Sequence, residues 1–359
     1  MSDCIFKRDK QTGIVMAWHN KTDVVETVTK ENAFPWEMER SPIYFFRKKQ
    51  GQPPIRCKVP ESSVFVASDD GGICGKPVPD TYAALTNSEF WEAGIDATKG
   101  TGAIIESAGT LFDRSRRFMT IRLPDDSTKI GNREFLHRIS FVDSIDGSTK
   151  FYAVNTETCV VCANTARIIM GDNSGEFRFE IRHTSGDNGL RTKIENANKT
   201  IESMVGVKAI FNDALRLANE VEMKEPDAKN LFAGWIGEGG EKLSTRSRNT
   251  VDRLVSLYKG GAGNRGETLL DAVSSVTDFY SHESRGEAKD AEGKADPANT
   301  QAKQWLSSEY GSAMRKKVEF MNEIFLFPSR KETGKAPEVN FGRIKKFQEI
   351  GHNMLAMAN

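Results

Sequence analysis

The sequence lacks the features that mark membrane, secreted and metal-binding proteins. No apolar run in its 359 residues approaches the roughly 20 residues that cross a bilayer. Its first residues, MSDC, lack the charged-then-apolar pattern of a signal peptide. Cysteine is scarce and irregularly spaced, which indicates reduced thiols at Cys4, Cys57, Cys74, Cys159 and Cys162. We therefore expect a soluble cytoplasmic protein with no membrane partner.

The sequence also lacks an excess of either charge. Lys+Arg and Asp+Glu both number 50, so the formal net charge is zero. Neutrality argues against a histone-like protein that binds polyanions over its whole surface, but it leaves room for a local basic groove. Hydrophobic residues make up 38% and charged residues 28%, as in a globular protein long enough for two or three domains.

The first half is rich in strand-like runs separated by turn signals. Hairpins are predicted from residues 4–8 with 14–18, 43–49 with 55–59, and 64–67 with 73–74. A helix is predicted over 80–97, capped by Asp80 or Thr81, followed by strands at 102–105 and 118–123.

The stretch 136–184 contains three further strand-like runs, at 136–142, 151–165 and 177–183. Asp146-Gly147 between the first two is a strong hairpin signal. The pairing of the last two runs stays open. Antiparallel strands would hold Asn164 and Thr165 apart from Arg182 and His183, whereas a parallel crossover would gather them into an anion-binding cluster.

After residue 185 the hydrophobic period becomes helical. Helices are predicted from 190 to 221, ended by Pro226, and then over 244–258, 268–282, 305–326 and 341–354. Segments 260–266 and 285–300 are predicted loops, the second of them mobile. The last helix is expected on its own core, or alternatively on a neighbouring subunit.

The pattern predicts an α+β fold: an N-terminal antiparallel β-rich sheet with a packed helix, followed by an α-helical C-terminal half. Four parts are expected along the chain. They are N-terminal β-hairpins at 1–60, a central β-rich domain at 61–185, a helical domain at 186–328, and a linker with an amphipathic helix at 329–359.

Four short strings appear in an order that is similar to one family: ESAGTL at 106–111, DGS at 146–148, CVVCANT at 159–165 and IRHT at 181–184. With LDAVSSVTDFYSHE at 270–283, they resemble the phage- and plasmid-type proteins that carry a domain of unknown function, number 932. That resemblance implies a phage, prophage or plasmid origin and no established activity. The β-then-α layout is also similar to the single-strand annealing proteins of phages.

Three patterns invite catalytic or metal-site interpretations. Cys159 and Cys162 lack the further ligands that zinc needs, so we interpret them as core cysteines. A metal-dependent nuclease could use Asp143, Asp146 and Glu157, although Asp before Gly is ordinary turn chemistry. The segment 237–244 departs from phosphate-loop spacing and is predicted to connect two helices. We expect no cofactor, no metal and no enzyme activity.

Basic residues form the more informative pattern. They gather near aromatic residues or in short clusters, and phosphates need cations while exposed bases stack on aromatic rings. The expected nucleic-acid-binding residues are Tyr44, Phe46, Arg47, Lys48, Lys49, Arg56, Lys58, Arg114, Arg116, Arg117, Arg182 and His183. Two further clusters are Arg246, Arg248 and Arg253, and Arg315, Lys316 and Lys317. Any one of these could instead be solvated charge balanced by acid.

The leading hypothesis is a homo-oligomeric phage- or plasmid-type protein that binds single-stranded DNA, with strand annealing or recombination as its further role. The alternatives are a mobile-element accessory factor that binds a host or phage protein, and a metal-dependent nuclease. The sequence leaves open the oligomer size, the strand preference and the host pathway.

Overall fold

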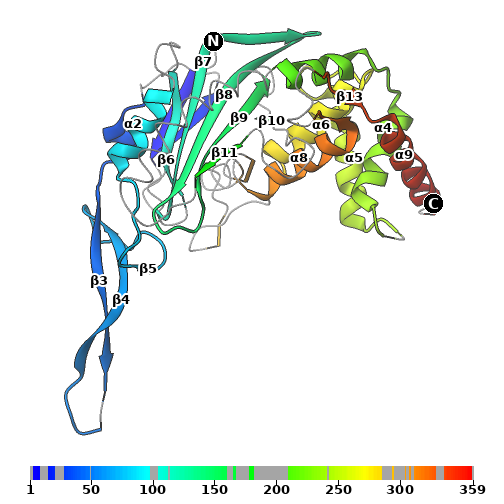
Figure 1. The fold of residues 1–359 in the computed structure, drawn as a ribbon. Helices are drawn as coiled ribbons and strands as arrows, with labels where there is room; N and C mark the ends of the chain where they lie inside the picture. Colours follow the sequence, from blue (N-terminus) through cyan, green and yellow to red (C-terminus); the bar gives the residue numbers. More distant parts are fainter. Residues whose placement is uncertain are drawn as a thin grey trace. The chain divides into compact units, whose positions relative to one another are not determined.

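The computed structural model describes residues 3–8, 15–20, 28–48, 50–97, 104–111, 114–159, 165–166, 178–181, 209–240, 242–284, 293–294, 304, 307–308, 311–328 and 335–357 (Figure 1). The chain forms two compact units. Unit 1 comprises Met1–Asp125, Arg138–Val154 and Arg178–Met204, and unit 2 comprises Asp126–His137, Asn155–Phe177 and Val205–Asn359. Antiparallel sheets dominate the N-terminal half and helices the C-terminal half, which confirms the α+β prediction.

The largest sheet is an antiparallel meander of β6 (Ile104–Leu111), β7 (Arg116–Ile130), β8 (Arg133–Ser144) and β9 (Phe151–Cys159). Two short strands, β10 (Thr165–Ala166) and β11 (Arg178–Ile181), both pair antiparallel with β9. All three runs expected in 136–184 therefore contribute strands. Because Ile181 lies opposite Phe151, at the start of β9, the antiparallel alternative is confirmed and the parallel crossover is wrong.

The helix that packs on this sheet is shorter than predicted. Helix α2 spans Asn87–Ala97 and buries Phe90 against sheet residues that include Phe151. It begins after Thr86, because the Glu89 N–H donates to Thr86 Oγ1 at 3.1 Å and the Thr86 N–H donates to the Glu89 carboxylate at 2.8 Å. The prediction that Asp80 or Thr81 caps the helix is therefore wrong.

The remaining strands of unit 1 form two small sheets. Strands β1 (Asp3–Arg8) and β2 (Val15–Asn20) form the first expected hairpin, and a short helix α1 (Lys30–Ala33) follows. Strands β3 (Met38–Arg47), β4 (Ile55–Ala67) and β5 (Val78–Pro79) form the second sheet. An isolated bridge between Val66 and Ile73 confirms the turn expected there.

Strands β3 and β4 make a long hairpin whose far end we call the arm, residues 43–59 (Figure 1). The sequence predicts separate strands at 55–59 and 64–67, but β4 runs through both. It does so because a register shift absorbs the extra residues: Pro42 pairs with Ser63, whereas Tyr44 already pairs with Lys58. Glu61, in that irregular stretch, adopts a left-handed φ of 52°.

Unit 2 is a helical bundle built around one apolar core (Figure 1). Residues 209–220 are helical and are followed by α4 (Glu225–Gly237), α5 (Thr245–Gly260), α6 (Leu269–His282), α8 (Ser312–Ile324) and α9 (Phe341–Ala356). A short ladder of β12 (Phe325–Leu326) and β13 (Glu338–Val339) precedes α9. The predicted helices at 244–258, 268–282 and 341–354 are confirmed, whereas α8 stops before residue 325.

Proline 226 begins a helix rather than ending one. It occupies the first turn of α4, where the missing proline N–H would have no intrahelical partner anyway. The preceding helical segment ends at residue 220, so four residues separate the two. Residues 190–208 of the helix expected at 190–221, and most of the expected loop at 285–300, lie outside the described residues.

The last helix docks on its own unit, as expected. Helices α4 and α9 approach so closely that a Cβ at Gly351 would lie 1.9 Å from the Asn230 carbonyl oxygen, and one at Gly234 would lie 1.9 Å from the Phe347 carbonyl oxygen. Arg343 on α9 pairs with Glu238 at 2.7 Å and also with Glu323. Among the described residues, no helix is long and apolar enough to span a membrane.

Candidate nucleic-acid interface

The arm sorts its side chains onto two chemically different faces. Directly opposed residues of an antiparallel pair share a face, and successive residues alternate between faces. Tyr44 pairs with Lys58 and Phe46 pairs with Arg56, so these four lie together on what we call the aromatic–cationic face. Phe45 pairs with Cys57 and Arg47 with Ile55, and these four make up the opposite, apolar face.

The aromatic–cationic face is open to solvent. Tyr44 is 41% exposed and Phe46 is 66% exposed, and Arg56 and Lys58 are exposed beside them. The Arg56 guanidinium carbon lies 3.6 Å from the centre of the Tyr44 ring, so the two side chains stack. The face thus offers an uncovered aromatic ring next to a cation that is already fixed in place.

In the described part of the chain, the cations of the arm are not neutralised by a carboxylate. Residues 41–60 include Arg47, Lys48, Lys49, Arg56 and Lys58 and contain neither Asp nor Glu. Within the described part of the chain, none of Arg47, Lys48, Arg56 and Lys58 takes part in an ion pair. Lys49 lies outside the described residues. The arm therefore concentrates positive charge on a protein whose total charge is zero.

Arg114, by contrast, is occupied by acid. Its guanidinium donates to Asp69 at 2.7 Å and to Asp70 at 3.0 Å, and it lies 5.1 Å from the centre of the Trp36 ring. Partial burial opposes its charge, but the hydrogen bonds and attraction of both carboxylates raise the pKa of Arg114. The ion pairs with Asp69 and Asp70 connect Arg114, just before β7, to the turn after β4. Arg114 also adopts a left-handed φ of 64°.

Arg117 is inside the protein. Its side chain is 0% exposed, pairs with Asp143 and donates to the Leu85 carbonyl at 2.8 Å and to Asn87 Oδ1 at 3.2 Å. A polymer at the surface does not reach such a group, so Arg117 has a structural role here. Arg116 is half-buried, and its Nε lies 3.5 Å from Ser148 Oγ. The expected basic cluster at 114–117 is therefore dispersed.

Several of the other predicted basic residues have partners within the fold. Arg182 and His183 lie outside the described residues. Arg253 pairs with Glu283 at 2.6 Å, and Lys316 pairs with Glu319 at 2.5 Å. Lys317 is fully buried and donates to Ser281 Oγ at 3.1 Å and to Ser308 Oγ at 2.9 Å. These interactions agree with the alternative interpretation, in which the basic residues pair within the protein and do not contact a nucleic acid.

The acidic residues considered for catalysis have intramolecular roles. Asp143 is the buried partner of Arg117. Asp146 accepts from the Lys76 N–H at 3.0 Å and from the Ser148 N–H at 2.9 Å, as a turn aspartate does. Among the described residues, no group of side chains could hold a metal ion. The side chains of Glu157, Cys159 and Cys162 lie outside that search.

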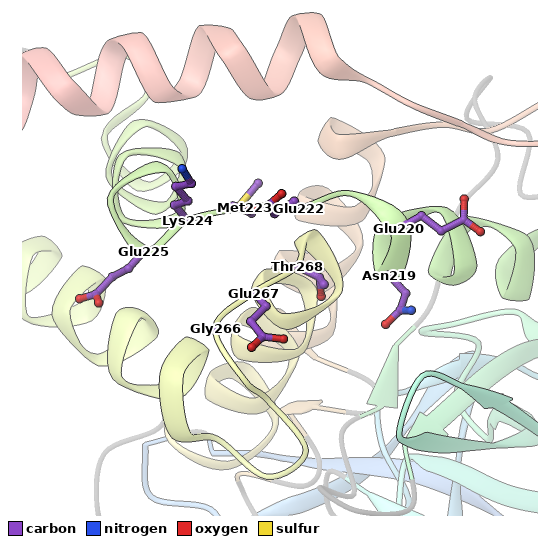
Figure 2. A pocket seen from close by; sticks show the side chains of 9 residues that line it. All are labelled: Asn219, Glu220, Glu222, Met223, Lys224, Glu225, Gly266, Glu267 and Thr268. Carbon is purple, nitrogen blue, oxygen red and sulfur yellow. The ribbon is translucent and has the colours of Figure 1, made fainter.

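Unit 2 contains an open cleft with the wrong charge for a polyanion. It has a volume of about 610 Å³ and is lined by Asn219, Glu220, Glu222, Met223, Lys224, Glu225, Gly266, Glu267 and Thr268 (Figure 2). Four of these are glutamates and one is a lysine, and Glu225 is paired with Lys259 at 3.1 Å. Like-charge repulsion makes this cleft unsuitable for phosphates.

Sequence reasoning located the arm but missed its division into faces. Phe45 is 51% exposed and Ile55 is 48% exposed on the apolar face, and neither was among the expected site residues. Their assignment depends on the register, since a slip of one residue would exchange the faces. The turn signal at 51–54 limits that register and could have suggested the pairing.

A search of curated proteins and a search of solved structures each found no match. A family model matches residues 76–310, a range that covers more than half of the chain and includes the meander, α2 and most of the helical bundle. The arm lies before the matched range. The chain therefore belongs to the family defined by a domain of unknown function, DUF932.

Proposed function

We propose that this protein binds single-stranded DNA through the arm. The observation that carries the proposal is the shared face of Tyr44, Phe46, Arg56 and Lys58, which places two rings and two cations side by side in solvent. Proteins that hold single strands combine stacking platforms with backbone-tracking cations in this way. Duplex DNA keeps its bases stacked on one another, so the rings favour a single strand.

The contributions have different physical origins. Stacking of one base on Phe46 or Tyr44 is worth roughly 1–3 kcal/mol. The cations act by releasing counterions from the strand, which makes binding weaken as salt rises. Arg47 and Lys48, at the end of the arm, extend the positive surface along the strand. Lys49, Arg182 and His183 remain candidate contacts by sequence alone.

The wider role in the proposal is promotion of strand annealing or recombination by a phage- or plasmid-type protein in the host cytoplasm. It is supported by the motif resemblance and by the β-then-α layout. Such a role needs strand capture without strand cleavage. The absence of a cleavage role agrees with the intramolecular partners of Asp143 and Asp146, because a nuclease would need these carboxylates free to bind metal ions.

The test is a fluorescence-anisotropy titration of a labelled oligonucleotide over a range of salt concentrations. The double variant Arg56→Gln/Lys58→Gln removes two phosphate contacts, and each contact contributes a slope of roughly 0.7 on a log–log salt plot of single-strand binding. We expect the slope to become shallower by about 1.4.

The matched control is Lys229→Gln/Lys259→Gln, which removes the same charge from the helices of unit 2. It should leave the affinity unchanged. An absence of binding at low salt, or an equal loss in both double variants, would refute the proposal.

A second candidate function, binding of a host or phage protein, is favoured by exposed apolar side chains near the C-terminus. Leu326 on β12 is 51% exposed, and Phe341 at the start of α9 is 61% exposed. A pull-down from host lysate distinguishes it from the first. A partner that survives nuclease treatment and is lost in Phe341→Ser would support this alternative.

A further inference from the structure

The two rings of the aromatic–cationic face have different surroundings. The Arg56 guanidinium carbon lies 3.6 Å from the centre of the Tyr44 ring, so one side of that ring is already occupied. In the ranges that the structure describes, no cation lies over the Phe46 ring and no other ring contacts it. The exposed fractions agree, at 41% for Tyr44 and 66% for Phe46. Phe46 is therefore the more accessible ring for an incoming base.

The contact between Arg56 and Tyr44 runs diagonally across the two strands. Arg56 directly opposes Phe46, but its guanidinium lies over Tyr44, which opposes Lys58. Diagonal neighbours on one face of an antiparallel pair are within reach of long and aromatic side chains. From Tyr44 to the tip of the arm the register is continuous, so these four side chains share one face. Because Arg56 leans toward Tyr44, it leaves the ring opposite it uncovered.

A cation that is held on a ring is prepared for a phosphate. A long arginine side chain loses conformational freedom when it binds, and a contact that already fixes it reduces that loss. A guanidinium stacked on a ring keeps the N–H donors at its edge free, and those donors match the oxygens of a phosphate. No carboxylate among the described residues pairs with Arg56 and competes for these donors.

We infer that the two rings act differently on a single strand: Phe46 stacks on a base, and Tyr44 is a positioning residue that holds Arg56 against a neighbouring phosphate. This assignment rests on the proposed function and extends it. A base on the occupied side of Tyr44 would displace Arg56, whereas the described residues place no cation or ring over Phe46. The two rings are two residues apart, about 7 Å along β3, so one short stretch of nucleotide chain meets both.

Strands with and without bases separate the two roles. The variants are Phe46→Leu and Tyr44→Leu, which remove rings from exposed positions, and the ligands are an oligonucleotide and the same strand with abasic sites throughout. We expect Phe46→Leu to weaken binding of the intact strand by about 5- to 150-fold, the equivalent of one stacked base. On the abasic strand Phe46→Leu should bind as the native protein does, with an unchanged salt slope.

Tyr44→Leu should have a different signature. We expect it to weaken binding of both strands alike, by roughly two- to fivefold, because Arg56 loses the cation–π contact that holds it. In the Arg56→Gln background Tyr44→Leu should weaken binding no further, a coupling that a merely structural role of Tyr44 would not produce. Tyr44→Phe keeps the ring and should bind both strands like the native protein.

The outcomes separate this assignment from the proposed function. A Tyr44→Leu loss confined to the intact strand would place a base on Tyr44, and a Phe46→Leu loss that persists on the abasic strand would exclude Phe46 as a base platform. An equal Tyr44→Leu loss with and without Arg56 would show that Tyr44 does not act through that cation. Each of these results overturns the assignment while the proposed function stands. If the native protein binds neither strand, the proposed function fails and the assignment fails with it.

Discussion

Three arginines of unit 1 show how the surroundings decide what a cation does. Arg56 stacks on the Tyr44 ring and has no carboxylate partner among the described residues, so its charge faces solvent. Arg114 is held by Asp69 and Asp70, which offset its charge at the surface. Arg117 is enclosed with Asp143, where each ion compensates the other for the water both have lost. Sequence clustering does not distinguish these cases, because the carboxylates come from distant parts of the chain.

The buried Arg117–Asp143 pair leads to a stability prediction. Arg117→Met should cost about 3–5 kcal/mol in the free energy of unfolding, because it removes the cation that pairs with the buried Asp143 carboxylate. The double variant Arg117→Met/Asp143→Leu removes both charges and should cost clearly less than Arg117→Met alone. Urea unfolding of the single and double variants measures the difference.

Arg116 serves as the control for that experiment. It is adjacent in sequence and only half-buried, so Arg116→Met should cost below about 1 kcal/mol. Equal costs for the two single variants would show that Arg117 is not held in the interior in the way described.

At the scale of elements, the crossing of α4 and α9 depends on the absence of two side chains. Gly351 and Gly234 each lie against a carbonyl oxygen of the other helix, at distances that no real Cβ occupies. We predict that Gly351→Ala destabilises unit 2 by roughly 1–3 kcal/mol or more, because the helices must move apart and lose core contacts. Thermal unfolding followed by circular dichroism measures the change.

Gly342, on the same helix, is the matched control. A Cβ there would meet only Asn340 Oδ1 at 3.8 Å. Gly342→Ala should therefore stabilise α9 by about 0.5–1 kcal/mol, because alanine is the better helix former. A Gly351→Ala protein as stable as Gly342→Ala would contradict the close crossing.

The elements also show where sequence reasoning succeeds and stops. The period of Ile344, Phe347 and Met354 was enough to predict α9, and Ser244 and Thr268 cap α5 and α6 close to the expected starts. The predicted start of α2 was wrong because Thr86 and Glu89 cap it later than Asp80 and Thr81 could. The single strand β4 was missed because its irregular stretch at 59–62 looks like a break when the opposing strand is unknown.

The two faces of the arm show the same limit of sequence-based prediction. Aromatic and basic residues were found by composition, but their separation into Tyr44, Phe46, Arg56 and Lys58 on one side required the register. Likewise, the burial of Arg117 required the fold of the meander, because Asp143 lies one strand away. Local sequence patterns were enough to predict most helices and strands. Only the tertiary pairing determined which charged side chains remained available to bind a ligand.

At the scale of the whole molecule, the neutral total charge and the basic arm predict different effects of pH on oligonucleotide affinity. The formal net charge is zero at pH 7 and the sequence pI is about 7.0, so the total charge becomes negative as the pH rises above 7. Lysine and arginine side chains ordinarily keep their charge well beyond that range. Exposed charges farther away than about 10 Å are largely screened at 0.1 M salt, so the arm should act through its own cations.

We therefore predict that oligonucleotide affinity at fixed ionic strength changes less than about twofold between pH 6.5 and pH 8.5, although the net charge changes sign. Anisotropy titrations in buffers of equal ionic strength measure it, with Arg56→Gln/Lys58→Gln as the reference for lost arm charge. If the affinity instead fell steeply above pH 7, binding would follow the total charge of the protein. The strand would then be held by a diffuse field over the surface, and the arm would have no special part in it.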